Sequence, residues 1–140
     1  MAEAENLAVL QRYYDELFVK HNLDAADELF APDYVSHHND PVGLPPGPEG
    51  VKQFVASTLE GFPDLTLTVE DMFAQGDLAS SRWTMRGTNT GTWFGNPATN
   101  RPADWAGVVV TRFAGGKIAE DWYNFDQLRL LMQLGVIPSQ

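Results

Sequence analysis

The stretch GKIAEDWYNFDQLRLLMQLG, residues 116–135, decides the fold because it joins an amphipathic strand to a closing helix. Alternate side chains of a strand face opposite ways, so Asp121, Tyr123 and Phe125 share one face of the strand expected over residues 117–125. Asp126 is placed to cap the helix that follows, and Gly135 is placed to end it. We expect this strand and helix to close one side of an apolar pocket.

Upstream of this stretch, hydrophobic periodicity predicts helices first and strands afterwards. Strand runs that follow helix runs are typical of α+β proteins. A curved antiparallel sheet with helices on its concave face forms a cone, whose open end is a natural ligand site. The expected segments are a helix over 3–20, a short helix capped by Asn22 or Asp24 and ending at 29, a break over 30–33, a strand over 34–38, a loop over 40–48, a helix from Pro48 to 59, a strand over 65–70, a turn at 75–77, a strand over 78–93, a loop over 94–104, a strand over 105–113 and a turn at 114–116.

Length and composition predict one globular domain spanning residues 1–140. The formal net charge of −10 disfavours nucleic-acid and anionic-membrane partners, which need clustered cations. The chain has no cysteine, which excludes disulfides and thiol nucleophiles. It shows neither a signal-peptide pattern nor a membrane-length apolar run, so we expect a cytoplasmic protein.

Three segments together resemble a known family: residues 116–135, DELFAPDYVSHH at 27–38 and GLPPGPEGVKQF at 43–54. They are similar to the SnoaL-like polyketide (ester) cyclases, of the superfamily of nuclear transport factor 2 and ketosteroid isomerase. The resemblance spans nearly the whole chain, and Trp122, Asp126 and Gln133-Leu134-Gly135 are its most specific part. It implies a cone-shaped α+β domain, a homodimer and no cofactor.

The resemblance does not extend to the catalytic residues of the aldol cyclases in that family. Their acid/base Asp aligns with Tyr123, and their assisting Gln and His align with Gly107 and Val109. On the same strand, the alignment implies that Asp121, two residues before Tyr123 and on the same face, is an inward carboxylate. Burial disfavours the charged form of a carboxyl, so Asp121 is a candidate general acid or base. The alternative is a hydrogen-bonded carboxylate at the rim without a catalytic function.

Histidines and tyrosines supply the other catalytic candidates. His38 aligns with the catalytic base of ketosteroid isomerase, and His37 with a histidine common in SnoaL-like chains; adjacent strand residues diverge, so normally one of the two faces inward. Because the two imidazoles would point in opposite directions, a metal site at residues 37–40 is also disfavoured. Tyr13 aligns near the isomerase's oxyanion-stabilising tyrosine, whereas periodicity favours Tyr14 on the apolar stripe. Core packing is the alternative for both tyrosines.

Asp126 has a second interpretation besides helix capping, because its place in the family pattern also makes it a catalytic candidate. Large apolar side chains could contact the ligand or simply fill the core. Residues at 82–86 alternate so that the apolar pair Trp83 and Met85 faces inward. The expected substrate-contacting residues are Tyr14, Trp83, Met85, Trp93, Trp105, Val109 and Phe125.

The sequence therefore predicts an acid–base enzyme that acts on a small, hydrophobic, polyketide-like or polycyclic substrate. Asp121 and His38 or His37 would exchange protons with it, and Tyr123 or Tyr13 would stabilise an enolate. The reaction would be cyclisation, isomerisation or a related lyase step. The alternatives are an epoxide-opening enzyme, in which Asp121 activates water or a hydroxyl, and a non-catalytic module that binds a hydrophobic ligand.

Overall fold

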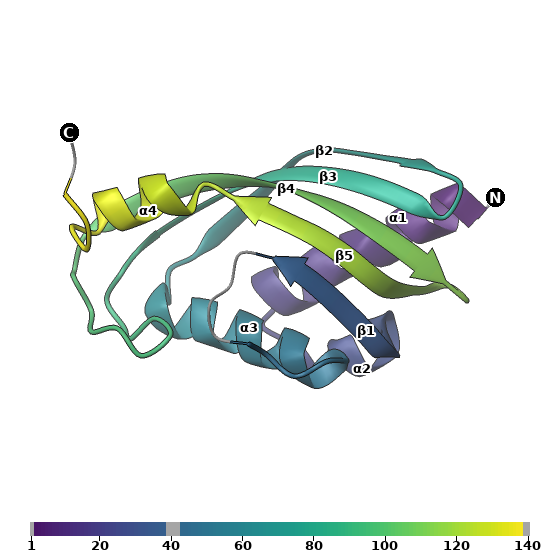
Figure 1. The fold of residues 1–140 in the computed structure, drawn as a ribbon, viewed down its shortest axis with the longest axis horizontal. Coiled ribbons are helices and arrows are strands. Elements are labelled where there is room, and N and C mark those ends of the chain that lie inside the picture. Colours follow the sequence, from purple (N-terminus) through teal and green to yellow (C-terminus); the bar gives the residue numbers. More distant parts are fainter. Residues whose placement is uncertain (1, 39–42, 139–140) are drawn as a thin grey trace.

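The computed structural model describes residues 2–38 and 43–138, with only the backbone of His38 included. Helices precede and cover a curved, unclosed sheet (Figure 1). The described elements are α1 (Ala2–Tyr13), the π-helix η1 (Tyr14–Val19), the 3₁₀ turn η2 (Leu23–Ala25), α2 (Ala26–Leu29), β1 (Phe30–His38), α3 (Pro48–Gly61), β2 (Thr66–Gln75), β3 (Leu78–Thr88), β4 (Pro102–Ala114), β5 (Lys117–Phe125) and α4 (Gln127–Gln133).

The described strands form a five-stranded sheet in the order β1-β5-β4-β3-β2. β2 to β5 pair antiparallel, and β1 pairs with β5 in parallel. Figure 1 shows α1, α2 and α3 on one side of this sheet and α4 beyond the end of β5. The α+β class and the helices on the concave face are thus as the sequence predicts. β5, which carries Asp121, lies between the edge strand β1 and the central strand β4.

Several predicted boundaries are confirmed. β5 occupies residues 117–125, and α3 begins at Pro48, where the missing N–H leaves no helical hydrogen bond unmade. The Asp126 side chain accepts a hydrogen bond from the backbone N–H of Arg129 at 3.0 Å and so caps α4. Gly135 has φ +74°, the left-handed conformation that favours glycine after a helix.

The predicted break at residues 30–33 is wrong, because β1 already begins at Phe30 and contains Pro32. A proline cannot donate to a sheet ladder, but an edge strand tolerates it. The pairing of β1 with β5 also shifts register between Phe30 and Val35, which removes the need for a regular ladder there. Of the predicted loop at 40–48, residues 40–42 lie outside the described part of the chain, and residues 43–47 are irregular.

The strand predicted over 78–93 ends earlier, at Thr88. Asn89 is the reason, since its fully buried side chain organises the following loop. Its amide nitrogen donates to the carbonyls of Gly61 and Gly91, both at 3.0 Å. Its amide oxygen accepts from the N–H and the hydroxyl of Thr99, both at 2.9 Å. The Asn89 side chain thus makes four hydrogen bonds. These bonds hold the backbone in a loop at the point where strand pairing ends.

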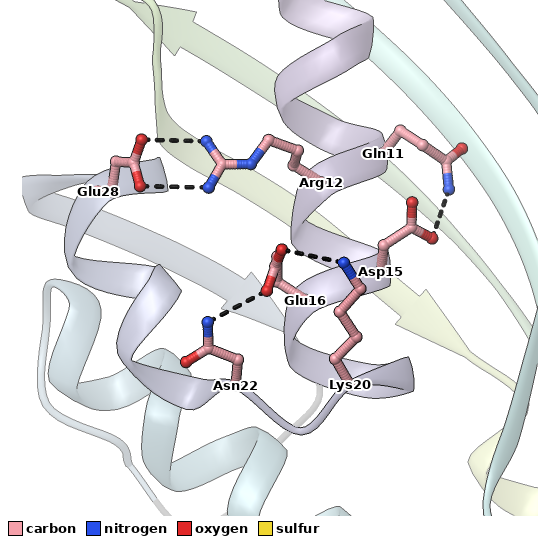
Figure 2. Close-up of polar contacts among 7 residues, drawn as sticks. All are labelled: Gln11, Arg12, Asp15, Glu16, Lys20, Asn22 and Glu28. Carbon is pink, nitrogen blue, oxygen red and sulfur yellow. Dashed lines mark hydrogen bonds and ion pairs between the residues drawn. The ribbon is translucent and has the colours of Figure 1, made fainter.

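Polar contacts fasten the first helix to the short helix that follows (Figure 2). Arg12 donates to both carboxylate oxygens of Glu28, at 3.0 and 3.2 Å. Asn22 donates to Glu16 at 3.1 Å, so its side chain does not cap the next turn as predicted, and neither does that of Asp24. These contacts are exposed and contribute little to stability.

Candidate active site

Asp121 is the centre of the candidate site and lies on the inner face of β5. The family alignment together with strand parity predicted this orientation, and the residue is 8% exposed. Tyr34 donates its hydroxyl hydrogen to one carboxylate oxygen of Asp121 at 2.6 Å. Ser36 donates to the other at 2.7 Å. Both donors belong to β1, whose parallel register sets Ser36 directly beside Asp121.

The Tyr34 hydroxyl remains a donor over the whole physiological pH range. Burial raises the pKa of Tyr34 well above its usual value near 10, and the negative charge of Asp121 raises it further. The phenol therefore stays protonated beside the carboxylate. A hydroxyl in this position stabilises the ionised form of its partner.

A cavity of about 230 Å³ opens beside Asp121, between β1, β5 and α3. Its apolar wall comes mainly from α3 and the segment before it, and its polar groups are three tyrosines, a serine and the carboxylate. This volume lies below the roughly 300–1,000 Å³ of common ligand pockets, so it suits a compact substrate. The lining residues are Tyr13, Tyr34, Val35, Ser36, Gly43, Leu44, Pro45, Pro46, Gly50, Val51, Phe54, Asp121 and Tyr123.

Tyr13 and Tyr14 both point inward, although they are adjacent on one helix. The helix changes from α to π geometry between them, and such irregular turns are frequent at functional sites. The hydroxyl of Tyr14 lies 2.6 Å from that of Ser81, in the core beneath the cavity. Tyr13 lines the cavity, and its hydroxyl makes no hydrogen bond within residues 2–38 and 43–138.

Burial raises the pKa of Tyr13 well above its usual value, so its phenol is protonated and able to donate. A donor that faces a cavity without a protein partner can bind an oxygen of a ligand. Of the two tyrosines between which the sequence left the oxyanion-stabilising function open, only Tyr13 lines this cavity.

Tyr123 also borders the cavity, at the position that aligns with the acid of the aldol cyclases. Its ring stacks on the indole of Trp83 with centroids 5.6 Å apart. Trp83 in turn covers Gly107, where a Cβ would lie 2.4 Å from the indole ring. The glycine that stands in place of the aldol cyclase's glutamine is therefore required by the packing of Trp83.

None of the seven predicted substrate-contacting residues lines this cavity, which corrects the sequence interpretation. Tyr14, Trp83, Met85 and Val109 border an interior void of about 10 Å³, too small for an organic ligand, and belong to the core. Phe125 packs on Tyr123. The physical reason is that parity predicts only which side chains of a strand face inward. It does not predict that the helices cover those near the middle of the strand.

Trp93 and Trp105 are likewise away from the cavity. Both pack on Phe62, with ring centroids 6.0 and 4.9 Å from it, and form a separate aromatic cluster at the end of α3. Trp93 also lies against Gly61, where a Cβ would come within 2.6 Å of its side chain. These two tryptophans, expected to contact the substrate, are thus part of the packing of the 89–101 loop.

The two histidines have different positions. His37 faces outward: its Nε2 lies 2.7 Å from a carboxylate oxygen of Glu120, and its ring stacks on Trp122 at 5.4 Å. His37 is therefore not among the cavity residues. The backbone of His38 ends β1 and pairs with Tyr123, but its side chain lies outside the described part of the structure. A catalytic function for His38 stays a prediction.

Asp126, the last catalytic candidate, is exposed and caps α4 away from the cavity lining. Sequence analysis missed Tyr34, Ser36 and Phe54 as site residues. Parity along β1 sets Tyr34 and Ser36 on the face opposite His37, but their contact with Asp121 depends on the parallel pairing of β1 with β5. No local pattern encodes that pairing.

Among the described residues, no group of three or more His, Cys, Asp or Glu side chains is arranged to hold a metal ion. Within the same residues, no helix is long and apolar enough to cross a membrane. The chemistry that this site can perform with its own side chains is proton transfer by Asp121 and hydrogen-bond donation by a tyrosine.

A model of the SnoaL-like polyketide cyclases matches residues 8–134. The chain belongs to this family. No curated protein matches the sequence significantly. Membership of this family confirms the resemblance found in the sequence, to which residues 116–135 contribute. The inward carboxylate on β5 is that of Asp121.

Solved structures of similar proteins confirm the fold over the full length of this SnoaL-like domain. A candidate SnoaL-like polyketide cyclase from Jannaschia sp. CCS1 is 25% identical, with a TM-score of 0.86 over 97% of this chain and 95% of that one. IdmH, a candidate polyketide cyclase from Streptomyces antibioticus, is 34% identical, with a TM-score of 0.77 over 93% and 98%. AclR, a candidate hydroxylase from Streptomyces galilaeus, is 27% identical, with a TM-score of 0.82 over 99% and 85%.

Proposed function

We propose that this protein is an acid–base cyclase or isomerase that acts on a compact, hydrophobic, polyketide-like ketone and requires no cofactor. One observation carries the proposal: the buried carboxylate of Asp121 borders the same apolar cavity as Tyr13, whose phenol has no hydrogen bond to the described part of the chain. A base beside a hydrogen-bond donor is the arrangement that enolisation needs.

In the proposed reaction, Asp121 removes a proton from a carbon next to a ketone. The electron pair of the broken C–H bond moves to the carbonyl oxygen, and the Tyr13 hydroxyl donates a hydrogen bond to that oxygen. The enolate carbon then attacks a second carbonyl, which closes a ring. In a β,γ-unsaturated ketone the dienolate instead takes the proton at its γ-carbon, which moves the double bond and isomerises the substrate. The proton on Asp121 returns to the product.

The test is proton exchange of 2-tetralone, a bicyclic ketone, in D₂O, followed by loss of its C1 proton signal in NMR spectra. The parent protein should accelerate exchange over buffer. Asp121→Asn should lower the rate by about a hundredfold or more, because general-base catalysis contributes that much. Tyr13→Phe should lower it by about a hundredfold, as expected for loss of one oxyanion donor.

Asp71→Asn is the matched control, because Asp71 is an exposed carboxylate paired with Arg82 on β3. It should exchange 2-tetralone at the parental rate. Equal rates for the parent and Asp121→Asn would refute the assignment of the base. Binding of 2-tetralone without proton exchange would favour a ligand-binding module. Hydrolysis of styrene oxide without exchange of 2-tetralone would favour epoxide opening.

A further inference from the structure

We propose that Tyr34 and Ser36 are positioning residues that hold Asp121 as an oriented, ionised base. This inference rests on the proposed function, and it concerns two residues that have no place in the enolisation steps. It follows from the geometry of two hydrogen bonds and from the strand that supplies both donors.

The two bonds favour the ionised carboxylate. Each oxygen of Asp121 accepts a hydroxyl hydrogen, at 2.6 Å from Tyr34 and 2.7 Å from Ser36. These lengths are at the short end for hydroxyl donors, as expected when the acceptor is charged. A protonated carboxyl group has one oxygen that must donate, so it would lose part of this pairing.

The two bonds also fix the plane of the carboxylate. Two donors on one strand, two residues apart, hold both oxygens at once, so rotation of the Asp121 side chain would break at least one bond. Tyr34 is itself held by burial and by edge-to-face contact with Phe30, with ring centroids 4.8 Å apart. The edge strand β1 therefore orients the base on β5, and the backbone pairing of Ser36 with Asp121 sets the alignment.

Other titratable groups also face Asp121 and belong in the test. Tyr13 and Tyr14 from the first helix, and Tyr34 from β1, all sense its charge, and Tyr123 borders the same cavity from β5. Tyr14 is the useful comparison. It is buried like Tyr34 and its hydroxyl is engaged at 2.6 Å, but with Ser81 instead of Asp121.

The experiment is a pH titration of the Asp121 carboxyl carbon by NMR in protein labelled with ¹³C-aspartate, with Asp121→Asn to assign the signal. Tyr34→Phe and Ser36→Ala should each move the titration midpoint to higher pH, by about one unit, since each removes a hydrogen bond to a charged group. Tyr14→Phe should leave the midpoint unchanged. Ser36→Thr keeps the hydroxyl and should restore the parental midpoint.

The same variants are then assayed for exchange of 2-tetralone as a function of pH. The acidic limb of the profile should move with the carboxyl midpoint, whereas a merely structural loss would lower the rate equally at every pH. Unchanged midpoints in folded Tyr34→Phe and Ser36→Ala would overturn the inference. Failure of the parent to exchange 2-tetralone would count against the proposed function alone, because the carboxyl titration does not depend on activity.

Discussion

Three tyrosines sense the charge of Asp121, and we expect their ionisation to limit the stability of the fold at high pH. Burial raises the pKa values of Tyr13, Tyr14 and Tyr34 above the usual value near 10. Above pH 10 the unfolded chain releases these protons, whereas the folded protein retains them. The folded state then binds more protons, so the free energy of unfolding falls as the pH rises.

We therefore expect these three tyrosines to titrate only as the protein unfolds. The measurement is tyrosinate absorbance at 295 nm together with far-ultraviolet circular dichroism between pH 8 and 13. The main absorbance change should coincide with loss of the dichroism signal. A smooth titration of all tyrosines near pH 10 in a protein that stays folded would contradict the burial of the three phenols.

At the level of elements, the last strand and helix show how the structure distinguishes a helix-capping residue from a catalytic one. Asp126 satisfied two sequence interpretations, a helix cap and a catalytic acid. The structure shows the cap, because its side chain bonds to the N–H of Arg129 outside the cavity. β1 shows the opposite case: its start was missed because Pro32 signals a break, although the edge of a sheet accepts it.

Asp126→Ala should lower the free energy of unfolding by about 1 kcal/mol, the usual cost of losing an N-cap. Asp126→Asn keeps an oxygen acceptor and should cost much less. Urea denaturation of both variants measures the difference. Exchange of 2-tetralone should match the parent in both; a large loss of exchange in a folded Asp126→Asn protein would return Asp126 to the list of catalytic candidates.

At the level of the whole molecule, the sheet has a covered face and an open one. Helices cover the inner face, while the outer face carries apolar side chains that are exposed, among them Val108, Val110 and Trp122. The homodimer implied by the family resemblance remains a prediction. We propose that a second copy of the chain would cover this outer face, since exposed apolar groups gather there on two adjacent strands.

Light scattering after size-exclusion chromatography tests this proposal. The parent should elute as a dimer, and the double variant Val108→Asp, Val110→Asp should elute as a folded monomer, because it buries two charges in the interface. Leu128→Asp is the matched control, an exposed apolar residue on α4. A parent that is monomeric at micromolar concentrations, or a control that dissociates equally, would contradict the proposal.

The sequence by itself determined the order of the elements, the α+β class and the face that Asp121 shares with Tyr123 and Phe125. These depend on periodicity, turn residues and strand parity, which are properties of neighbours along the chain. The family resemblance then implied that this face points inward. Residues 116–135 were sufficient for the strand, the cap and the stop of the last helix. The family membership of the chain also follows from sequence, over residues 8–134.

Only the tertiary structure decided which residues meet Asp121. Tyr34 and Ser36 are 87 and 85 positions away from it, and they reach it because β1 pairs in parallel with β5. Depth decided that Trp83 and Met85 are core and that Tyr13 faces the cavity. Periodicity records the face of an element but not what covers it, so the base was visible in the sequence and its environment was not.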